Sequence, residues 1–348
     1  ERPVQFEHVF ASVQSLNAAG IERINPAHFD VVIVDEFHHA AAPSYERLLS
    51  RLEPRELLGL TATPDRADGM PILHWFGNRV AADLRLWDAI DQQRLVPFQY
   101  YGVHDGTDLT AVPWRRGIGY DITELGNVYT ANDAWARTVI AQTQRFVGDV
   151  HSMRALGFCV NVSHARFMAH HFNEAGVKAI SITGETPDDE RRAALTGLRD
   201  GKINVVFSVD LFNEGVDVPA VDTLLMLRPT ESATVFMQQL GRGLRQSDGK
   251  SVCTVIDFIG QHRKEFRFDS RFRALFSLSR KDLEKGVKDG FTFLPAGCDF
   301  WLDRVAQEIV LRSLRESLPS SWRQRVAELN GLIAQGYEPR LATYLTES

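Results

Sequence analysis

The sequence predicts an α/β protein with two doubly wound parallel sheets and a mostly helical C-terminal extension. Short apolar runs alternate with segments of helical periodicity in two successive series, a pattern typical of parallel sheets. Two runs of the first series end in polar clusters, Asp35-Glu36 and Thr61-Ala62-Thr63, and ligands of open α/β sheets collect at such strand ends. A chain of 348 residues exceeds one typical core, so we expect domains over residues 1–95, 96–260 and 261–348.

The composition is that of an ordinary globular protein, since 44% of the residues are apolar and 24% are charged. A net charge of -6 argues against a globally basic nucleic-acid coat but leaves room for a local basic cleft. Three cysteines lie far apart without a CxxC pair, which favours a reducing compartment over a disulfide framework or a zinc site. No apolar run approaches the roughly 20 residues that span a bilayer, and no signal peptide is visible. We therefore expect a cytoplasmic protein without a membrane partner.

The first domain centres on Val31–His39, which reads VVIVDEFHH. Its apolar half predicts a buried parallel strand, and the carboxylates of Asp35 and Glu36 could hold Mg²⁺ through water and orient an attacking water. The alternative is a strand followed by an acidic helix start. The expected neighbours are a short strand and turn over 8–16, a helix over 44–52, a strand over 57–60 and a helix over 83–93.

The second domain begins with an aromatic strand over 98–103 and a long loop over 104–128 that is rich in Gly, Asp and Thr. Gly176 closes one of the helices that follow. The remaining expected elements are helices over 132–146, 163–175, 188–199 and 234–240, and strands over 157–162, 178–182, 203–208, 223–227 and 252–256.

The helix over 188–199 carries a clear start signal. Thr186 suits the N-cap and Pro187 the first helical position. The three acids Asp188 to Glu190 could be mistaken for a nuclease cluster, but the positive end of a helix dipole explains them more simply.

The extension differs from the first two domains in composition, because His262–Arg280 is basic and rich in aromatic residues. Two interpretations remain open. The rings could stack on bases while the arginines contact phosphates, or a helix could pack its phenylalanines on the second domain with its arginines outward. The packing helix is favoured. A further helix is expected over 302–318, and the tail to Ser348 also looks helical.

The stretch QQLGRGLR, Gln238–Arg245, predicts a phosphate contact. It sets Arg242 and Arg245 three positions apart, on one face of an expected helix. Two guanidinium forks on one face suit phosphate oxygens, and the two glycines allow close approach. The alternative is a surface helix with two solvated arginines.

Two other patterns carry weaker signals. In DLFNEGVDVP, Asp210–Pro219, Gly215 lets the backbone approach a ligand and Asp217 could accept a hydrogen bond from a ribose hydroxyl. The neighbours His38 and His39 could suggest a metal site, but no third ligand has metal-like spacing.

The order of these motifs resembles the motor core of superfamily 2 helicases and translocases. DEFH at Asp35–His38 is similar to the DEAH-type Walker B motif, and Thr61-Ala62-Thr63 to the coupling motif after it. Phe158–Arg166, Ser208–Pro219 and QQLGRGLR resemble motifs of the second motor domain, the last being the arginine-finger motif. The motif sequences also resemble those of bacterial members that are related to restriction-enzyme motor subunits and excision-repair helicases, as seen in VDEFHHA, LTATPDRADG and DFIG. The resemblance implies two RecA-like domains, with residues 1–95 as the C-terminal part of the first.

The resemblance also implies ATP and Mg²⁺ as cofactors and a nucleic acid, DNA more readily than RNA, as the partner. Asp35 would hold Mg²⁺ through water, and Glu36 would orient or activate the attacking water. His38 would link the nucleotide site to the second domain. Thr61 and Thr63 would couple hydrolysis to motion.

Further roles follow from the same resemblance for residues of the second domain. Arg242 and Arg245 would reach the γ-phosphate, as arginine fingers do. Gln238 would contact them or the nucleotide, which Gly215 and Asp217 would also bind. The candidates for nucleic-acid contact are Gln14, His164, Arg166 and Ser208.

The phosphate-cradling Walker A loop, G-x-x-x-x-G-K-[ST], is missing from the sequence. Gly249-Lys250-Ser251 lacks the upstream glycine and precedes a strand where a helix is required. We therefore expect a fragment that has lost the front of its first motor domain, from a parent protein that is a nucleic-acid-stimulated ATPase. The chain alone should bind and hydrolyse ATP poorly or not at all.

Three classes of function compete. The favoured one is a fragment of an ATP-dependent DNA helicase or translocase. The second is the motor of a restriction or defence nuclease, in which the parent would carry a nuclease domain or subunit. The third is a nucleic-acid-binding module without catalysis, for which Arg242 and Arg245 would be dispensable.

Overall fold

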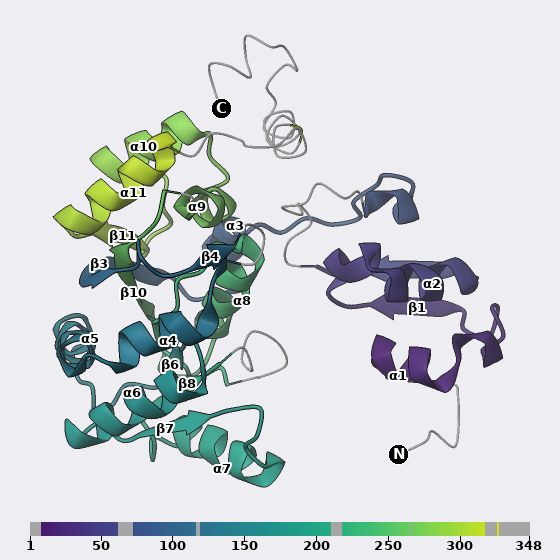
Figure 1. Ribbon diagram of the computed structural model, residues 1–348. Coiled ribbons are helices and arrows are strands. Elements are labelled where there is room, and N and C mark those ends of the chain that lie inside the picture. Colours follow the sequence, from purple (N-terminus) through teal and green to yellow (C-terminus); the bar gives the residue numbers. More distant parts are fainter. Residues whose placement is uncertain are drawn as a thin grey trace. The chain divides into compact units, whose positions relative to one another are not determined.

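The computed structural model describes residues 8–61, 72–115, 119–209, 218–264 and 266–316, together with residue 326 (Figure 1). The chain forms two compact units that part between Asp83 and Leu84. Unit 1 is the part of the chain up to Asp83, and unit 2 runs from Leu84 to Leu318. Helix α3 (Leu86–Asp91) lies within the expected helix over 83–93 and belongs to unit 2. The predicted first domain, residues 1–95, includes this helix, whereas the observed unit 1 ends before it.

Unit 1 has a sheet of two parallel strands. Strand β1 (Val31–Val34) pairs with β2 (Glu56–Gly59), and Val31 lies opposite Glu56. The other described elements of unit 1 are α1 (Val13–Ala19), α2 (Pro43–Arg51) and 3-10 turns over Ile21–Arg23, Phe37–Ala41 and Leu73–Phe76.

The first element of unit 1 corrects the sequence prediction. The segment over 8–16 was expected to form a strand and a turn, but α1 begins at Val13. Ser12 caps this helix, since its side chain accepts a hydrogen bond from the amide of Ser15. A local cap has therefore decided the conformation of a segment whose apolar pattern was ambiguous.

The sheet of unit 1 is covered unevenly. On one face, Val34 packs with Phe37 and Leu49 in a small core. On the other, the side chains of Val31 and Ile33 are 55% and 60% exposed, and those of Leu58 and Leu60 are 42% and 46% exposed. The strand expected to be buried is therefore only half covered.

Unit 2 contains a seven-stranded sheet in the order β11-β3-β10-β9-β6-β8-β7, and every pairing in it is parallel. This confirms the doubly wound α/β class. Strands β6, β8 and β9 are buried at every residue, as expected for a sheet that is covered on both faces. The strands are β3 (Phe98–Asp108), β6 (Ala155–Phe158), β7 (Ala179–Ile182), β8 (Val205–Ser208), β9 (Thr223–Met226), β10 (Cys253–Gln261) and β11 (Asp299–Leu302).

The helices of this sheet follow the sequence pattern. Gly176 ends α6 in a left-handed conformation with φ 81°, as expected of a helix-closing glycine. Helix α7 has the expected bounds, but its N-cap is Pro187, and the Thr186 hydroxyl instead accepts from the amide of Thr183. The helices are α5 (Asp133–Phe146), α6 (Val162–Glu174), α7 (Asp188–Arg199) and α8 (Ala233–Leu244).

The segment over 104–128 is more regular than expected. Strand β3 continues to Asp108, and β4 (Trp114–Arg115) forms a short antiparallel pair with β5 (Gly119–Tyr120). Helix α4 (Ile122–Thr130) follows, capped by the Asp121 side chain. The abundance of Gly, Asp and Thr, which suggested a loop, supplies these turns and this cap.

The extension is part of unit 2. It contains α9 (Phe268–Phe276), α10 (Arg280–Asp289) and α11 (Arg304–Glu316), and β11 joins the main sheet beside β3. The phenylalanines of α9 are buried, as the packing interpretation predicted. Its arginines are not all outward, however, because Arg271 is 2% exposed and forms an ion pair of 2.6 Å with the buried Asp257 of β10.

Aromatic rings explain how α9 holds a charged side chain in the core. The Arg271 guanidinium lies 4.7 Å from the ring centroid of Phe268, 5.0 Å from that of Phe272 and 5.4 Å from that of Phe236. Tyr100 donates a hydrogen bond to Asp257, and burial raises the pKa of that tyrosine, so the hydroxyl keeps its proton. No helix within the described parts of the chain is long and apolar enough to cross a membrane.

Candidate functional site

The polar clusters that follow β1 and β2 lie at the same edge of the unit 1 sheet. The Leu60 amide donates to the Val34 carbonyl at 2.9 Å, and the Phe37 amide donates to the Leu60 carbonyl at 2.8 Å. Gly59 permits this approach, because a Cβ there would come within 2.7 Å of the Phe37 ring. The structure thus brings Asp35 and Glu36 close to Thr61.

The backbone turns sharply at Glu36. This residue has φ 49° and ψ 48°, a left-handed conformation that costs a residue with a Cβ about 1–2 kcal/mol. The Glu36 amide donates to Asp35 Oδ1 at 2.9 Å, which helps to hold the turn. Backbone outliers of this kind cluster at functional sites. No pattern in the sequence predicts this left-handed turn.

His38 connects the two clusters. Its side chain is buried, with Nδ1 3.2 Å from Glu36 Oε2 and also 3.2 Å from Thr61 Oγ1. One ring nitrogen has either one proton or one lone pair. It can donate to Glu36 or to Thr61, or it can accept from the Thr61 hydroxyl. The three side chains therefore form a contact with alternative hydrogen-bond arrangements.

The oxygens at this edge fit a hydrated magnesium ion. The Asp35 carboxylate is exposed at the end of β1, with Glu36 next to it. The described residues contain no group of three His, Cys, Asp or Glu side chains that could hold a metal. Mg²⁺ commonly keeps several waters and uses one or two carboxylates, so Asp35 would suffice as its protein ligand.

The two arginines of QQLGRGLR differ in setting. Arg242 lies in α8, but the helix ends at Leu244, and Arg245 is its C-cap with extended backbone. The expectation of one shared helical face is therefore wrong for Arg245. The close approach of Gly243 is to the sheet, since a Cβ there would run into Cys253 Sγ and come within 2.9 Å of Leu224. Gly241 faces open space.

The candidates for nucleic-acid contact divide by exposure. Gln14 and Arg166 are exposed, and Arg166 lies 3.8 Å from Glu185. His164 and Ser208 are 0% exposed, so their side chains cannot reach a polymer from these positions. Among the other predicted site residues, Thr63, Gly215 and Asp217 lie outside the described residues.

His164 has a structural environment. Its ring stacks on Tyr129 at 5.1 Å and lies 5.2 Å from Trp135, and Nδ1 accepts from the Val160 amide at 3.3 Å. Burial lowers the pKa of His164 to about 3, so the ring is neutral at physiological pH. The residue stabilises the packing of α4, α5 and α6 in its neutral form.

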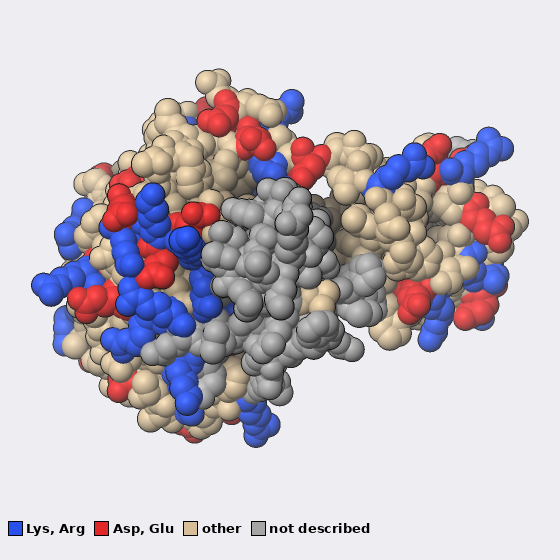
Figure 2. Space-filling model, turned by 90° about the horizontal axis from the view of Figure 1, so that it is seen from above, with Lys and Arg blue, Asp and Glu red and all other residues tan. Residues whose placement is uncertain are grey.

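A basic surface is present in the extension although the chain as a whole is acidic. Figure 2 shows Lys and Arg side chains gathered over unit 2 on the side of α10 and α11, with acidic residues among them. Glu284 accepts from Lys288 and Arg315, each at 2.8 Å, which neutralises part of this charge. The exposed cations of the two helices are Lys281, Lys285, Lys288, Arg304, Arg312 and Arg315.

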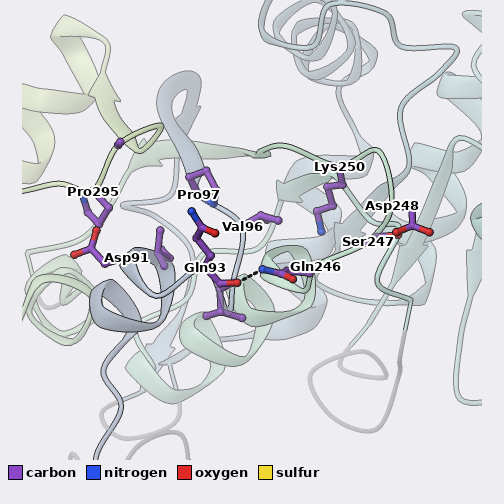
Figure 3. A pocket seen from close by; sticks show the side chains of 12 residues that line it. Asp91, Gln93, Val96, Pro97, Gln246, Ser247, Asp248, Lys250 and Pro295 are labelled. Carbon is purple, nitrogen blue, oxygen red and sulfur yellow. Dashed lines mark hydrogen bonds between the residues drawn. The ribbon is translucent and has the colours of Figure 1, made fainter.

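A hollow of about 570 Å³ lies next to the amino ends of β3 and β10 (Figure 3). The Gln246 side chain donates to the Gln93 carbonyl across it. Lys250 donates to the carbonyls of Arg245 at 2.8 Å and Pro219 at 3.1 Å, and burial lowers the pKa of its amine. This lysine ties the end of the arginine segment to its surroundings. It also precedes β10, as expected, which separates it from a Walker A lysine.

Two family models match the chain. Residues 2–66 match the type III restriction enzyme res subunit, and residues 140–247 match the helicase conserved C-terminal domain. The chain is 31% identical over 262 residues to an ATP-dependent mitochondrial helicase of Schizosaccharomyces pombe named irc3. That match covers 73% of this chain and 42% of the relative.

Two solved structures share the fold. An HsdR subunit fragment of a type I restriction enzyme from Vibrio vulnificus YJ016 superimposes with a TM-score of 0.57 at 20% identity, over 83% of this chain and 51% of that one. The type ISP restriction-modification enzyme LlaBIII bound to DNA gives 0.59 at 13% identity, over 94% and 27%. The chain spans about half or less of the length of each relative. The solved structures share the fold, and the two family models, the match to irc3 and the motif order together show that the chain belongs to the superfamily 2 helicases and translocases, related to restriction-enzyme motor subunits.

Proposed function

We propose that the chain is the motor region of an ATP-dependent helicase or translocase that moves on nucleic acid. The observation that carries this proposal is the contact of Glu36, His38 and Thr61 at one edge of the unit 1 sheet. A residue that activates water and a residue that couples hydrolysis to motion must be linked by contacts, so that a change at one alters the other. His38 touches both.

The chemistry of unit 1 follows from these positions. Mg²⁺ would neutralise phosphate charge, held by Asp35 through water. Glu36 orients the attacking water and accepts its proton. When the Glu36 carboxylate turns to that water, His38 loses one partner and keeps Thr61. Hydrolysis would therefore change the hydrogen bonding of Thr61, the residue that couples it to motion.

Unit 2 serves the same reaction. Arg242 and Arg245 stabilise the charge that develops on the γ-phosphate, and Gln238 orients one of them. The different settings of the arginines suggest different roles. Arg242 projects from a helix anchored by Gly243, whereas Arg245 lies on the extended segment that Lys250 fixes. Gly215 and Asp217 remain proposed nucleotide contacts.

We expect the polymer to be DNA rather than RNA. We also expect the protein to act in the cytoplasm. The structural relative LlaBIII is bound to DNA. Gln14 and Arg166 remain candidates for backbone contact, whereas the side chains of His164 and Ser208 are buried and do not contact the polymer. The cations of α10 and α11 offer further phosphate contacts.

Residues 1–348 alone should turn over ATP slowly, because the sequence has no complete phosphate-cradling loop. The direct test is ATP hydrolysis by the purified chain, with and without DNA. Robust DNA-stimulated turnover that Glu36→Gln abolishes would refute this expectation while supporting the catalytic role of Glu36.

The catalytic role itself is tested in a longer form of the polypeptide that supplies such a loop. Glu36→Gln should abolish steady-state hydrolysis and preserve ATP binding, because only the proton acceptor changes. Glu46→Gln, an exposed glutamate of α2, is the matched control and should leave turnover unchanged. Equal turnover of the two variants would exclude Glu36 as the water-activating residue.

A second candidate function is favoured by two of the comparisons. The match of residues 2–66 is to a restriction-enzyme subunit, and both folds cited above come from restriction enzymes. The motor would then serve a nuclease domain or subunit. Cleavage of plasmid DNA that requires ATP and is lost in Glu36→Gln would identify this case. A binding module without catalysis would retain all its activity in Arg242→Ala and Arg245→Ala.

A further inference from the structure

The unit 2 surface carries a cluster of aromatic rings around a cation that plays no part in the proposed ATPase site. Tyr101 of β3 and Trp301 of β11 lie opposite each other in the sheet register. Phe146, the last residue of α5, packs against both, and the exposed Arg145 precedes it. We name these four residues the aromatic shelf.

The rings of the shelf are closely arranged. Tyr101 and Phe146 are stacked, with centroids 4.2 Å apart and planes inclined by 18°. Trp301 lies 5.6 Å from Phe146 and 6.2 Å from Tyr101. The Arg145 guanidinium lies 5.0 Å from the Phe146 centroid and 5.7 Å from that of Trp301. The planar guanidinium of Arg145 thus lies against the rings of Phe146 and Trp301.

The shelf differs from the packing on the other face of the same two strands. There, Tyr100 is 0% exposed and stacks on Phe300, and α9 covers the pair through Phe272. On the shelf side, α5 ends at Phe146, and all three rings remain partly exposed. The same strand pair therefore has one face in the core and one at the surface.

The chemistry of the shelf selects its ligand. An aromatic cage without a cation suits a ligand cation, but here Arg145 already provides the positive charge. The complementary ligand has a flat π face and a negative charge. An unpaired nucleotide has both, because its base can stack on a guanidinium or an indole while its phosphate pairs with the cation.

We propose that the aromatic shelf is a second nucleic-acid contact, at which an unpaired base of a single strand stacks on Arg145 and Trp301. The inference rests on the proposed function, because it presumes that the motor handles nucleic acid. It places that contact on the strand pair β11-β3 at one edge of the unit 2 sheet, whereas β8, which precedes the Ser208–Pro219 motif, lies toward the other edge. A single strand of nucleic acid bound there would remain attached to unit 2 during the cycle of ATP binding and hydrolysis.

The test measures binding of a fluorescein-labelled oligo-dT to purified residues 1–348 by anisotropy at several salt concentrations. Trp301→Ala should weaken binding about 5- to 150-fold, the range for loss of one stacked base. Trp301→Phe should retain most of the affinity, since a ring remains. Arg145→Gln should also lower the salt slope by about 0.7, the contribution of one single-strand phosphate, whereas Trp301→Ala should leave the slope unchanged.

Matched controls separate the shelf from general effects. Arg137→Gln removes another exposed arginine of α5, and Phe293→Ala removes a ring that is 46% exposed elsewhere in unit 2. Both should bind oligo-dT like the unaltered chain. A direct readout that needs no substitution is photocrosslinking of oligonucleotides with 5-iodouracil, which should join to the peptide that contains Trp301 or Tyr101.

Three results would overturn the proposal. One is oligo-dT affinity unchanged in Trp301→Ala and Arg145→Gln, with crosslinks mapped elsewhere, and this result leaves the proposed ATPase function intact. Another is equal weakening by the control variants, which would indicate a non-specific charge effect. The third is no binding of oligo-dT at low salt, which removes the shelf whatever the ATPase experiments on Glu36 show.

Discussion

The two units contain parallel strands of similar sequence in different surroundings. Strand β1 reads VVIV and β8 reads VVFS, and both precede functional motifs. In unit 2, β8 is buried at every position, and Val206 is 0% exposed. In unit 1, Val31 is 55% exposed. An apolar strand sequence is therefore compatible with burial on both faces of a sheet. The elements that pack on the sheet determine which of the strand's side chains are buried.

The core of unit 2 should react most strongly to the loss of a charge partner. Arg271→Met leaves Asp257 buried without its cation, which should cost about 3–5 kcal/mol of unfolding free energy. Urea unfolding followed by circular dichroism measures the loss. Lys285→Met on the exposed side of α10 is the control and should stay within about 0.5 kcal/mol.

A companion variant shows the origin of that cost. Asp257→Asn combined with Arg271→Met removes both charges and should recover part of the stability, because a lone buried charge is the main penalty. A loss below about 1 kcal/mol for Arg271→Met alone would contradict the buried ion pair.

The anchoring of α8 gives the next largest effect. Gly243→Ala would place a methyl group against Cys253 and Leu224, and overpacking of this kind costs about 1–3 kcal/mol. Gly241→Ala meets open space and should stabilise the helix by about 0.5–1 kcal/mol. Thermal unfolding of both variants measures the difference. Equal effects would show that α8 does not pack on the sheet through Gly243.

The buried His164 makes unit 2 sensitive to acid. Its pKa is lowered to about 3, so below pH 6.5 the unfolded chain binds a proton that the folded protein excludes. Stability should therefore fall as the pH drops from about 6.5 toward 3, and the loss reaches about 2 kcal/mol at pH 5. His164→Phe should remove this part of the difference between pH 7.5 and pH 5. The exposed His170→Gln should preserve it, and the reverse pattern would rule out a buried neutral His164.

The smallest effect is expected on the open face of unit 1. Val31→Thr should change stability by no more than about 0.5 kcal/mol, because the side chain is already in water. The same change at Val206 buries a hydroxyl and should cost about 1–3 kcal/mol. Hydrogen exchange of peptides from each unit reports the two losses separately. Equal losses would mean that the face of β1 is covered in solution.

Sequence reasoning recovered the fold wherever the local pattern and the tertiary context agree. The bounds of α7, the parallel sheet and the neighbouring ends of β1 and β2 all follow from periodicity and strand-end chemistry. It failed where one residue decides the conformation. The Ser12 cap made a helix of an expected strand, and the end of α8 at Leu244 removed Arg245 from the helical face.

The candidate site shows the same limit. The motif residues Glu36, His38 and Thr61 were found from their order along the chain, but their mutual contact depends on the left-handed turn at Glu36. The burial of Arg271 was also hidden, because its partner Asp257 lies on a distant strand. Such pairs depend on the assembled sheet, which a pattern along one segment does not contain.

Under the proposed function, residues of both units serve one ATPase reaction. The most direct measurement is a double-mutant cycle on kcat for Glu36→Gln and Arg242→Ala, in a form of the protein that supplies a phosphate-binding loop. Each single change should lower kcat by about 10³-fold or more, and the double variant should be only slightly slower than the worse single variant. Full turnover by Arg242→Ala, or losses that multiply in the double variant, would contradict the claim.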